Sequence, residues 1–167
     1  MRVRRLFLTA GLALAATLTS IVVISPTAAH AAGTEACTPN NRSFNVPNDP
    51  DVDVYIEMCI YKDGNFRGGF ARVYWDVHSW PYAHGKLFDA FVVQVRTERY
   101  DTATRTVTCD LTSGINNHDH GYSLCSTQGY TSTAQGGWSG DGKVTYNIDG
   151  DGNGNYTWDL SGSPRVN

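Results

Sequence analysis

The chain has 167 residues, of which 13 are basic, 16 are acidic and 17 are glycine, and charged residues make up 17% of the total. That length supports one domain rather than two. The low charge content excludes a coiled coil, a strongly basic nucleic-acid-binding protein and a charge-rich disordered chain.

The first 31 residues have the pattern of an export signal. Three arginines precede an apolar or small run over 6–24, and residues 29–31 read Ala-His-Ala, the small-x-small pattern of a cleavage site. We predict that cleavage after residue 31 removes segment 1–31 as a signal peptide. A retained membrane anchor is the alternative, because the apolar run approaches spanning length. The pair Arg4-Arg5 also resembles a twin-arginine motif, so the export route stays open.

Cleavage changes the charge balance of the protein. It removes three of the 13 basic residues and no acidic one, which leaves ten against 16 and a formal charge of −6. An acidic secreted protein has no long-range attraction for nucleic acid or for an anionic membrane. We therefore expect an extracellular protein whose partners are other secreted proteins, with glycans as a further possibility.

All four cysteines lie after the predicted cleavage site, at Cys37, Cys59, Cys109 and Cys125. An even number of cysteines in an exported chain indicates two disulfides. Three connectivities are open, and we expect Cys37–Cys59 and Cys109–Cys125, which are the nearest pairs in sequence. A four-cysteine zinc site is the alternative, but the chain has no C-x-x-C pair.

Residues 32–50 are polar and contain three prolines and several asparagines. We expect an extended N-terminal arm that is pinned at Cys37 and free before it. The arm is either a disordered leader or a binding segment.

Residues 51–167 alternate between apolar and polar positions in several short segments separated by turn signals. Residues 112–141 are loop-like, and no segment after the signal has the period of a helix. This pattern predicts an all-β fold, an antiparallel β-sandwich of about seven or eight strands with two disulfides, and a small closed barrel is the alternative. The expected strands lie near 52–61, 71–77, 87–95, 107–111, 122–126, 144–148 and 156–160.

The sharpest local motif is Asp-Gly-Asp-Gly-Asn-Gly at 149–154. Asp149, Asp151 and Asn153 place oxygen ligands at alternate positions, with glycine sixth, as in the first half of a calcium loop. The twelfth position is Leu160 instead of a bidentate Glu, and the flanks are strands. We therefore favour a hairpin turn, keep calcium as the alternative, and expect no other cofactor.

Catalytic motifs are weak. His118 and His120 have the spacing of a metal pair on a strand, but they lie in a loop, and a third ligand would have to come from His78 or His84. Segment 137–141 does not complete a G-x-S-x-G motif. We expect a protein that is not an enzyme.

The aromatic side chains give a second signal. Trp75 and Trp158 lie on apolar strand faces and are expected in the core. Aromatic residues in loops are candidates for binding hot spots or sugar stacking, and otherwise cap the ends of the sandwich. The loop candidates are Trp80, Tyr82, Tyr130 and Trp138.

The Ala-rich export signal, the two local disulfides and the hairpin from Asp-Gly-Lys to Trp-Asp-Leu near the C-terminus resemble the small secreted β-sandwich proteins of filamentous actinobacteria. In layout the chain is also similar to the adaptor subunit of secreted umbrella-type antibacterial toxin particles. That resemblance implies a flexible arm and a compact sandwich that joins a scaffold protein to a lectin-like subunit.

We therefore expect a secreted protein-binding module that uses its arm, an exposed sheet edge or its aromatic loops. An inhibitor of a secreted protease or glycosidase and a carbohydrate-binding protein are the alternatives.

Overall fold

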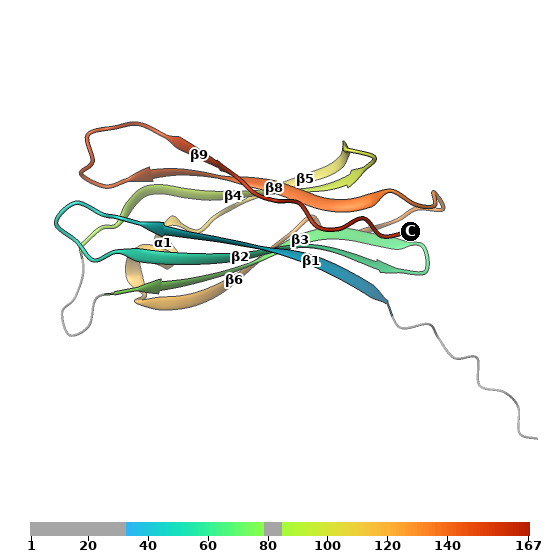
Figure 1. Cartoon of the computed structure of the whole chain (residues 1–167), viewed down its shortest axis with the longest axis horizontal. Helices are drawn as coiled ribbons and strands as arrows, with labels where there is room; N and C mark the ends of the chain where they lie inside the picture. Colours follow the sequence, from blue (N-terminus) through green and yellow to red (C-terminus); the bar gives the residue numbers. More distant parts are fainter. Residues whose placement is uncertain (1–32, 79–84) are drawn as a thin grey trace, which may run out of the picture. The chain divides into compact units, whose positions relative to one another are not determined.

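The computed structural model describes residues 33–78 and 85–167, and Figure 1 shows them as two facing layers of antiparallel strands. The predicted signal peptide, 1–31, lies outside the described residues, so its cleavage stays a prediction. The expected all-β sandwich is confirmed. None of the helices in the described part is long and apolar enough to cross a membrane.

Nine strands and one short helix make up the described part. Sheet A has the order β1-β2-β3-β6, with β7 beside β3, and sheet B has the order β5-β4-β8-β9. The strands of sheet A are β1 (Thr34–Phe44), β2 (Val52–Asp63), β3 (Phe66–Val77), β6 (His120–Ser126) and β7 (Tyr130–Thr131). The strands of sheet B are β4 (Phe88–Arg99), β5 (Thr102–Asp110), β8 (Trp138–Ile148) and β9 (Tyr156–Asp159).

The core forms because the strands alternate strictly between apolar and polar residues. On β2, Ile56 and Met58 are fully buried, and on β3 the same holds for Val73. Strand β4 faces them from sheet B with Phe91 and Val93, also fully buried. Burying a side chain of this size contributes about 1.5–3 kcal/mol, so this double layer of aliphatic and aromatic groups is the main stabilising feature.

The predicted extended arm over 32–50 is pinned at Cys37 as expected, but it is not free before this residue, because an edge strand of sheet A begins at Thr34. Residues 34–44 form β1, which pairs with β2 along its whole length, from Thr34 opposite Lys62 to Phe44 opposite Val52. The segment is polar because β1 is an edge strand, with one face exposed and the other at the open rim of the sandwich.

Three inward-facing residues attach β1 to sheet B. Asn40 accepts a hydrogen bond from the Ser161 backbone N–H (2.7 Å) and donates one to the Ser161 carbonyl (3.2 Å). Phe44 makes edge contacts with the rings of Phe88, Phe91, Tyr146 and Trp158. The Arg42 guanidinium lies 5.0 Å from the Tyr146 ring centroid and 5.8 Å from that of Trp158.

At the opposite side of the sandwich, a disulfide and a helix connect the two sheets. Cys109 on β5 is bonded to Cys125 on β6, which joins the two sheets. Helix α1 (Thr112–Asn117) connects these strands and buries Ile115. Helix α1 and strand β7 therefore replace parts of the loop expected over 112–141, while β6 confirms the strand expected near 122–126. Trp138 likewise begins β8 instead of lying in a loop.

Both expected disulfides are confirmed. Cys37 and Cys59 lie directly opposite each other on β1 and β2, with their Cα atoms 4.1 Å apart, and this bond fixes the register of the edge strand. No free cysteine is found among the described residues. Two disulfides are typical of an oxidising compartment.

We predict that Asn40→Ala lowers the free energy of unfolding by about 1–3 kcal/mol, because it leaves the Ser161 N–H and carbonyl without their partner. The measurement is a urea unfolding curve. Asn41→Ala is the matched control, because Asn41 is exposed on the other face of the same strand, and a change of less than about 0.5 kcal/mol is expected. Equal stability of the two variants would contradict the attachment of β1 through Asn40.

Candidate functional site

The outward-facing side of sheet A, called face A below, is the candidate site. Antiparallel pairing without a register shift arranges its side chains in rows that run across the strands. The rows on β1, β2, β3 and β6 are Ser43-Asp53-Asp76-His120, Asn41-Tyr55-Tyr74-Tyr122, Pro39-Glu57-Arg72-Leu124 and Cys37-Cys59-Phe70-Ser126.

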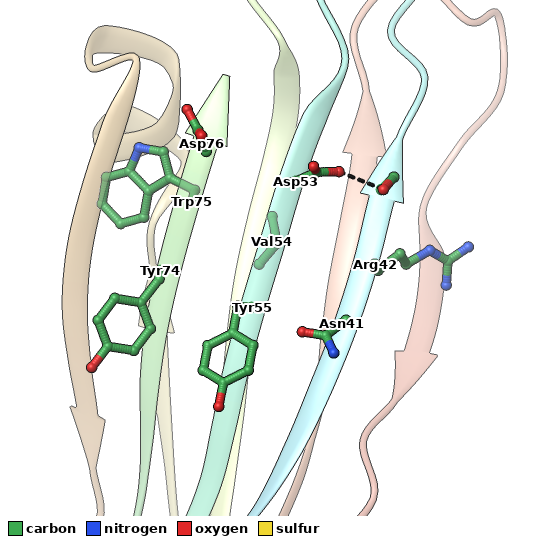
Figure 2. A pocket seen from close by; sticks show the side chains of 9 residues that line it. Asn41, Arg42, Asp53, Val54, Tyr55, Tyr74, Trp75 and Asp76 are labelled. Carbon is green, nitrogen blue, oxygen red and sulfur yellow. Dashed lines mark hydrogen bonds between the residues drawn. The ribbon is translucent and has the colours of Figure 1, made fainter. Parts of the chain in front are cut away.

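Three tyrosines form the centre of face A. Tyr55, Tyr74 and Tyr122 lie opposite one another on neighbouring strands. The ring centroids of Tyr55 and Tyr74 are 5.8 Å apart, and those of Tyr74 and Tyr122 are 5.0 Å apart. The rings are tilted by 48° and 45° to each other, so they form a ridged apolar surface and not a flat platform. Figure 2 shows Tyr55 and Tyr74 side by side on their strands.

A hollow of about 380 Å³ lies at one side of this tyrosine row. Its polar wall holds Asp53 and Asp76, which lie opposite each other on β2 and β3. Asp53 accepts a hydrogen bond from the Ser43 hydroxyl (Figure 2) and lies 3.1 Å from the His78 imidazole. Two carboxylates and one guanidinium, that of Arg42, line the hollow, so its net charge is negative and it favours a positively charged group over an anion.

Arg72 organises the row on the other side of the tyrosines. Its guanidinium pairs with Glu35 at 2.8 Å and with Glu57 at 3.2 Å, and it lies 5.0 Å from the Phe70 ring centroid. Hydrogen bonds to Glu35 and then to Glu57 raise the pKa of Arg72, while partial burial opposes them. The charge of Arg72 is therefore compensated within face A.

A groove of about 810 Å³ continues along the same face. Gly68 lies at its floor, and a side chain there would come within 3.0 Å of the Gly129 backbone. The absence of a side chain at this position leaves the groove open between aromatic walls. The large residues that line the groove are Tyr61, Phe66, Phe70, Arg72, Tyr122 and Leu124.

The outer face of sheet B has a different chemistry. Its cross-strand rows contain threonine, glutamine, lysine and aspartate, for example Thr108-Gln94-Lys143-Asp159. Among the described residues, six large hydrophobic side chains are exposed, and four of them lie on face A: Phe66, Tyr74, Tyr122 and Leu124. A cluster of exposed aromatic residues on one face of a soluble protein indicates an interaction surface.

The aromatic residues predicted from the sequence have different locations. Trp80 and Tyr82 lie outside the described residues. Trp138 is only 2% exposed, and its ring packs against Tyr130, which is half-buried. Trp138 is therefore part of a second, smaller core and not a surface binding residue, because the chain from 134 to 138 folds back and its indole donates to the Ala134 carbonyl.

The predicted calcium loop forms the turn between β8 and β9. Asp149 lies 3.2 Å from the Lys86 ammonium, and Asp151 accepts a hydrogen bond from the Asn153 backbone N–H at 2.7 Å. Gly150 and Gly152 have positive φ angles, as a tight turn requires. These contacts are those of a hairpin turn stabilised by its own side chains.

The predicted histidine pair lies beside Tyr122 at one end of face A, with His120 on β6 and only His118 in the loop expected for both residues. His118 and His120 line a hollow of about 370 Å³ with Asp110. Within the described ranges, the one group of three His, Cys, Asp or Glu side chains with ligand atoms within 4.8 Å of one another is Glu35, Cys37 and Cys59. Both of these cysteines are in a disulfide, so they lack the thiolate that binds a metal.

Sequence reasoning missed the tyrosine row. The alternation predicted that Tyr55 and Tyr74 point away from the apolar side of their strands, but a single strand does not reveal which residues are opposite. The register of β3 with β6, set by the covering of Gly121 by Trp75, brings Tyr122 beside them. A run of outward-facing tyrosines on predicted strands is the signal that the sequence offered.

A buried carboxylate lies on the other sheet. Glu98 is 6% exposed, its Oε1 lies 2.9 Å from Arg96 Nε, and Arg96 also pairs with Asp141 at 2.6 Å. Burial raises the pKa of Glu98, the charge of Asp141 raises it further, and Arg96 opposes both.

Comparison with models of known protein families gave no match, and neither did comparison with curated proteins or with solved structures. Function is therefore inferred from the residues and geometry of face A.

We predict that Glu57→Gln lowers the pKa of Tyr55. The hydroxyl of Tyr55 donates to Glu57 Oε1 at 3.0 Å, and this hydrogen bond is the largest cause of the raised pKa of Tyr55. The measurement is an NMR titration of the tyrosine ring carbons at alkaline pH. Asp63→Asn removes a carboxylate from the exposed end of the same strand and serves as the control. An unchanged titration of Tyr55 in Glu57→Gln would show that the hydrogen bond is not formed.

We predict that Glu98→Gln stabilises the protein at neutral pH and that this gain shrinks as the pH falls. Because the folded-state pKa of Glu98 is raised, the folded chain binds this proton more tightly than the unfolded chain, whose value is about 4.3. Lowering the pH through the folded-state pKa therefore favours folding of the wild type and not of the variant. Unfolding curves between pH 7 and pH 4 test this, and a difference that does not vary with pH would contradict it.

Proposed function

We propose that this protein is a secreted, non-catalytic protein-binding module whose partner docks on face A. The observation that carries the proposal is the concentration of exposed tyrosine, phenylalanine and leucine on one face of a disulfide-bonded sandwich. Tyrosine, phenylalanine and arginine are enriched in protein interfaces, and the most important contacts come from such aromatic side chains.

The charges on face A define the chemistry of the partner. Around the tyrosine row lie the carboxylates of Asp53, Asp76, Glu35 and Glu57, while Arg72 is paired with the last two. Excess negative charge at the rim of an apolar centre complements a partner that has an apolar patch bordered by lysine or arginine. Such complementarity increases the association rate and fixes the orientation of the complex.

The tilt of the tyrosine rings favours a protein partner over a flat polysaccharide surface. A flat carbohydrate surface needs coplanar aromatic rings, and here neighbouring rings are tilted by more than 40°. The resemblance to toxin adaptors implies that the partner on face A belongs to a larger extracellular particle. The resemblance implies binding through a flexible arm. Residues 34–44 of that arm form β1, which is part of sheet A. We therefore place the binding site on face A instead of on the arm.

The test begins with the native mass of the untagged protein in culture supernatant, measured by size-exclusion chromatography with light scattering and identification of the co-eluting chains. We expect co-elution with another secreted protein. Recovery without any other chain, together with retention on insoluble glycans or inhibition of a hydrolase, would overturn the proposal in favour of a carbohydrate-binding protein or an inhibitor.

With the partner identified, we predict that Tyr74→Ala raises the dissociation constant by about 30-fold, the effect of losing a central aromatic contact. The measurement is calorimetric titration of the two proteins. Thr157→Ala, on the outer face of sheet B, is the control and is expected to leave the affinity unchanged. Because Tyr74 is 39% exposed, its replacement leaves the core intact, which a thermal unfolding curve verifies.

A further inference from the structure

Strand β6 is an edge strand of sheet A, and its exposed backbone edge is called the β6 rim below. This edge differs from those of the other three edge strands, β1, β5 and β9. β1 contains Pro39, β9 has four residues, and β5 has an exposed arginine and a register shift in its pairing with β4. Each of these features hinders the addition of a further strand. The sequence of β6, His-Gly-Tyr-Ser-Leu-Cys-Ser, has no proline, lysine, arginine or carboxylate.

The backbone of β6 offers hydrogen-bonding groups on this rim. The Val77 N–H donates to the Asp119 carbonyl, and the Thr127 N–H donates to the Gly69 carbonyl, at the two ends of the β3–β6 pair. In an antiparallel pair such residues alternate with residues that make no bond to the neighbouring strand. The odd-numbered residues of β6 therefore bond to β3, and the N–H and C=O groups of the even-numbered residues point away from the sheet.

These even-numbered residues also have the exposed side chains. Tyr122 is 53% exposed and Leu124 is 54% exposed, both on face A. The rim therefore combines unpaired backbone groups with apolar side chains at the same two positions, and an incoming β-strand satisfies both.

We propose that β6 pairs with β6 of a second copy of this protein, in an antiparallel arrangement centred on Ser123. In this register Tyr122 lies opposite Leu124 of the second copy, and Leu124 lies opposite its Tyr122. His120 and Ser126 pair in the same reciprocal way, so every outward-pointing backbone group of β6 has a partner. A twofold interface requires this self-complementarity, and one seven-residue strand supplies it.

The inference rests on the backbone hydrogen bonds and the sequence of β6, which the proposed function does not use. Tyr122 and Leu124 belong to both surfaces, whereas Tyr74 lies on β3, in face A but not at the rim. Tyr74→Ala is therefore expected to leave the dimer intact. Loss of partner binding by Tyr74→Ala in a chain that is always monomeric would support the proposed function and overturn the dimer.

The first measurement is sedimentation equilibrium of the purified, exported protein from micromolar to about millimolar concentration, together with amide hydrogen exchange by NMR. We expect a concentration-dependent dimer. The amides of Tyr122 and Leu124 are expected to become protected as the dimer forms, whereas those of Gly121 and Ser123, which bond to β3, are protected at every concentration. A monomer with unprotected Tyr122 and Leu124 amides throughout would overturn the proposal. Protection that appears only on addition of a different protein would assign the rim to that protein instead.

Variants test the register. Tyr122→Glu and Leu124→Lys are each expected to raise the dimer dissociation constant at least tenfold. The double variant places the introduced glutamate of each copy opposite the introduced lysine of the other, and it is expected to recover part of the affinity. Tyr100→Glu, at a tyrosine of similar exposure outside β6, is the control and is expected to have no effect. Failure of the double variant to dimerise better than either single one would overturn this pairing.

Discussion

The pairing of β2 with β3 runs from Val52 opposite Val77 to Asp63 opposite Phe66 without a register shift. Because side chains alternate between the two faces, this single register decides which residues are buried and which form face A. A slip of one residue would turn Ile56 and Val73 towards solvent and the tyrosines into the core. The Cys37–Cys59 bond extends the same register to β1, and the close fit of Trp75 over Gly121 extends it to β6. Sheet B lacks this regularity, since its pairing shifts near Thr97 and between Phe88 and Ala90.

The sequence allowed prediction of those parts of the fold in which burial is one-sided. Alternation identified β2, β3 and the β8–β9 hairpin, and proximity along the chain identified both disulfides. β1 was not predicted as a strand because its inward residues are polar: Asn40 bonds to a backbone across the rim, and Arg42 lies on aromatic rings. The groups that these residues contact across the rim, the Ser161 backbone and the Tyr146 ring, are more than a hundred positions away in sequence. Trp138 was assigned to the surface for a similar reason, since its neighbours in sequence are glycines and its neighbours in space come from the C-terminal segment.

The candidate site was harder to predict than the fold because it is a property of several strands at once. Tyr55, Tyr74 and Tyr122 are separated by 19 and 48 positions, and no local motif links them. The sequence instead drew attention to loops, where aromatic residues and carboxylates stand out against glycine. The structure shows that the carboxylates at 149–151 serve a turn, whereas regular strand positions on face A bring together four of the six exposed large hydrophobic side chains of the described residues. Hydrophobic side chains left exposed on a sheet lower solubility, so their concentration on one face supports the proposal that a partner covers them.

Face A and the β6 rim are adjacent, and this adjacency has a consequence for binding. In the proposed antiparallel pairing, side chains opposite each other point to the same side, so both copies of face A lie on one side of a continuous sheet. The dimer would then present two tyrosine rows in a fixed relation, and a partner with two matching patches would gain from bivalent attachment without any new contact. Such a gain depends on the rigid connection through β6, because a flexible link would lower the effective concentration of the second site. A weak interface at each face would therefore be sufficient for stable assembly, provided that the β6 rim holds the two faces in place.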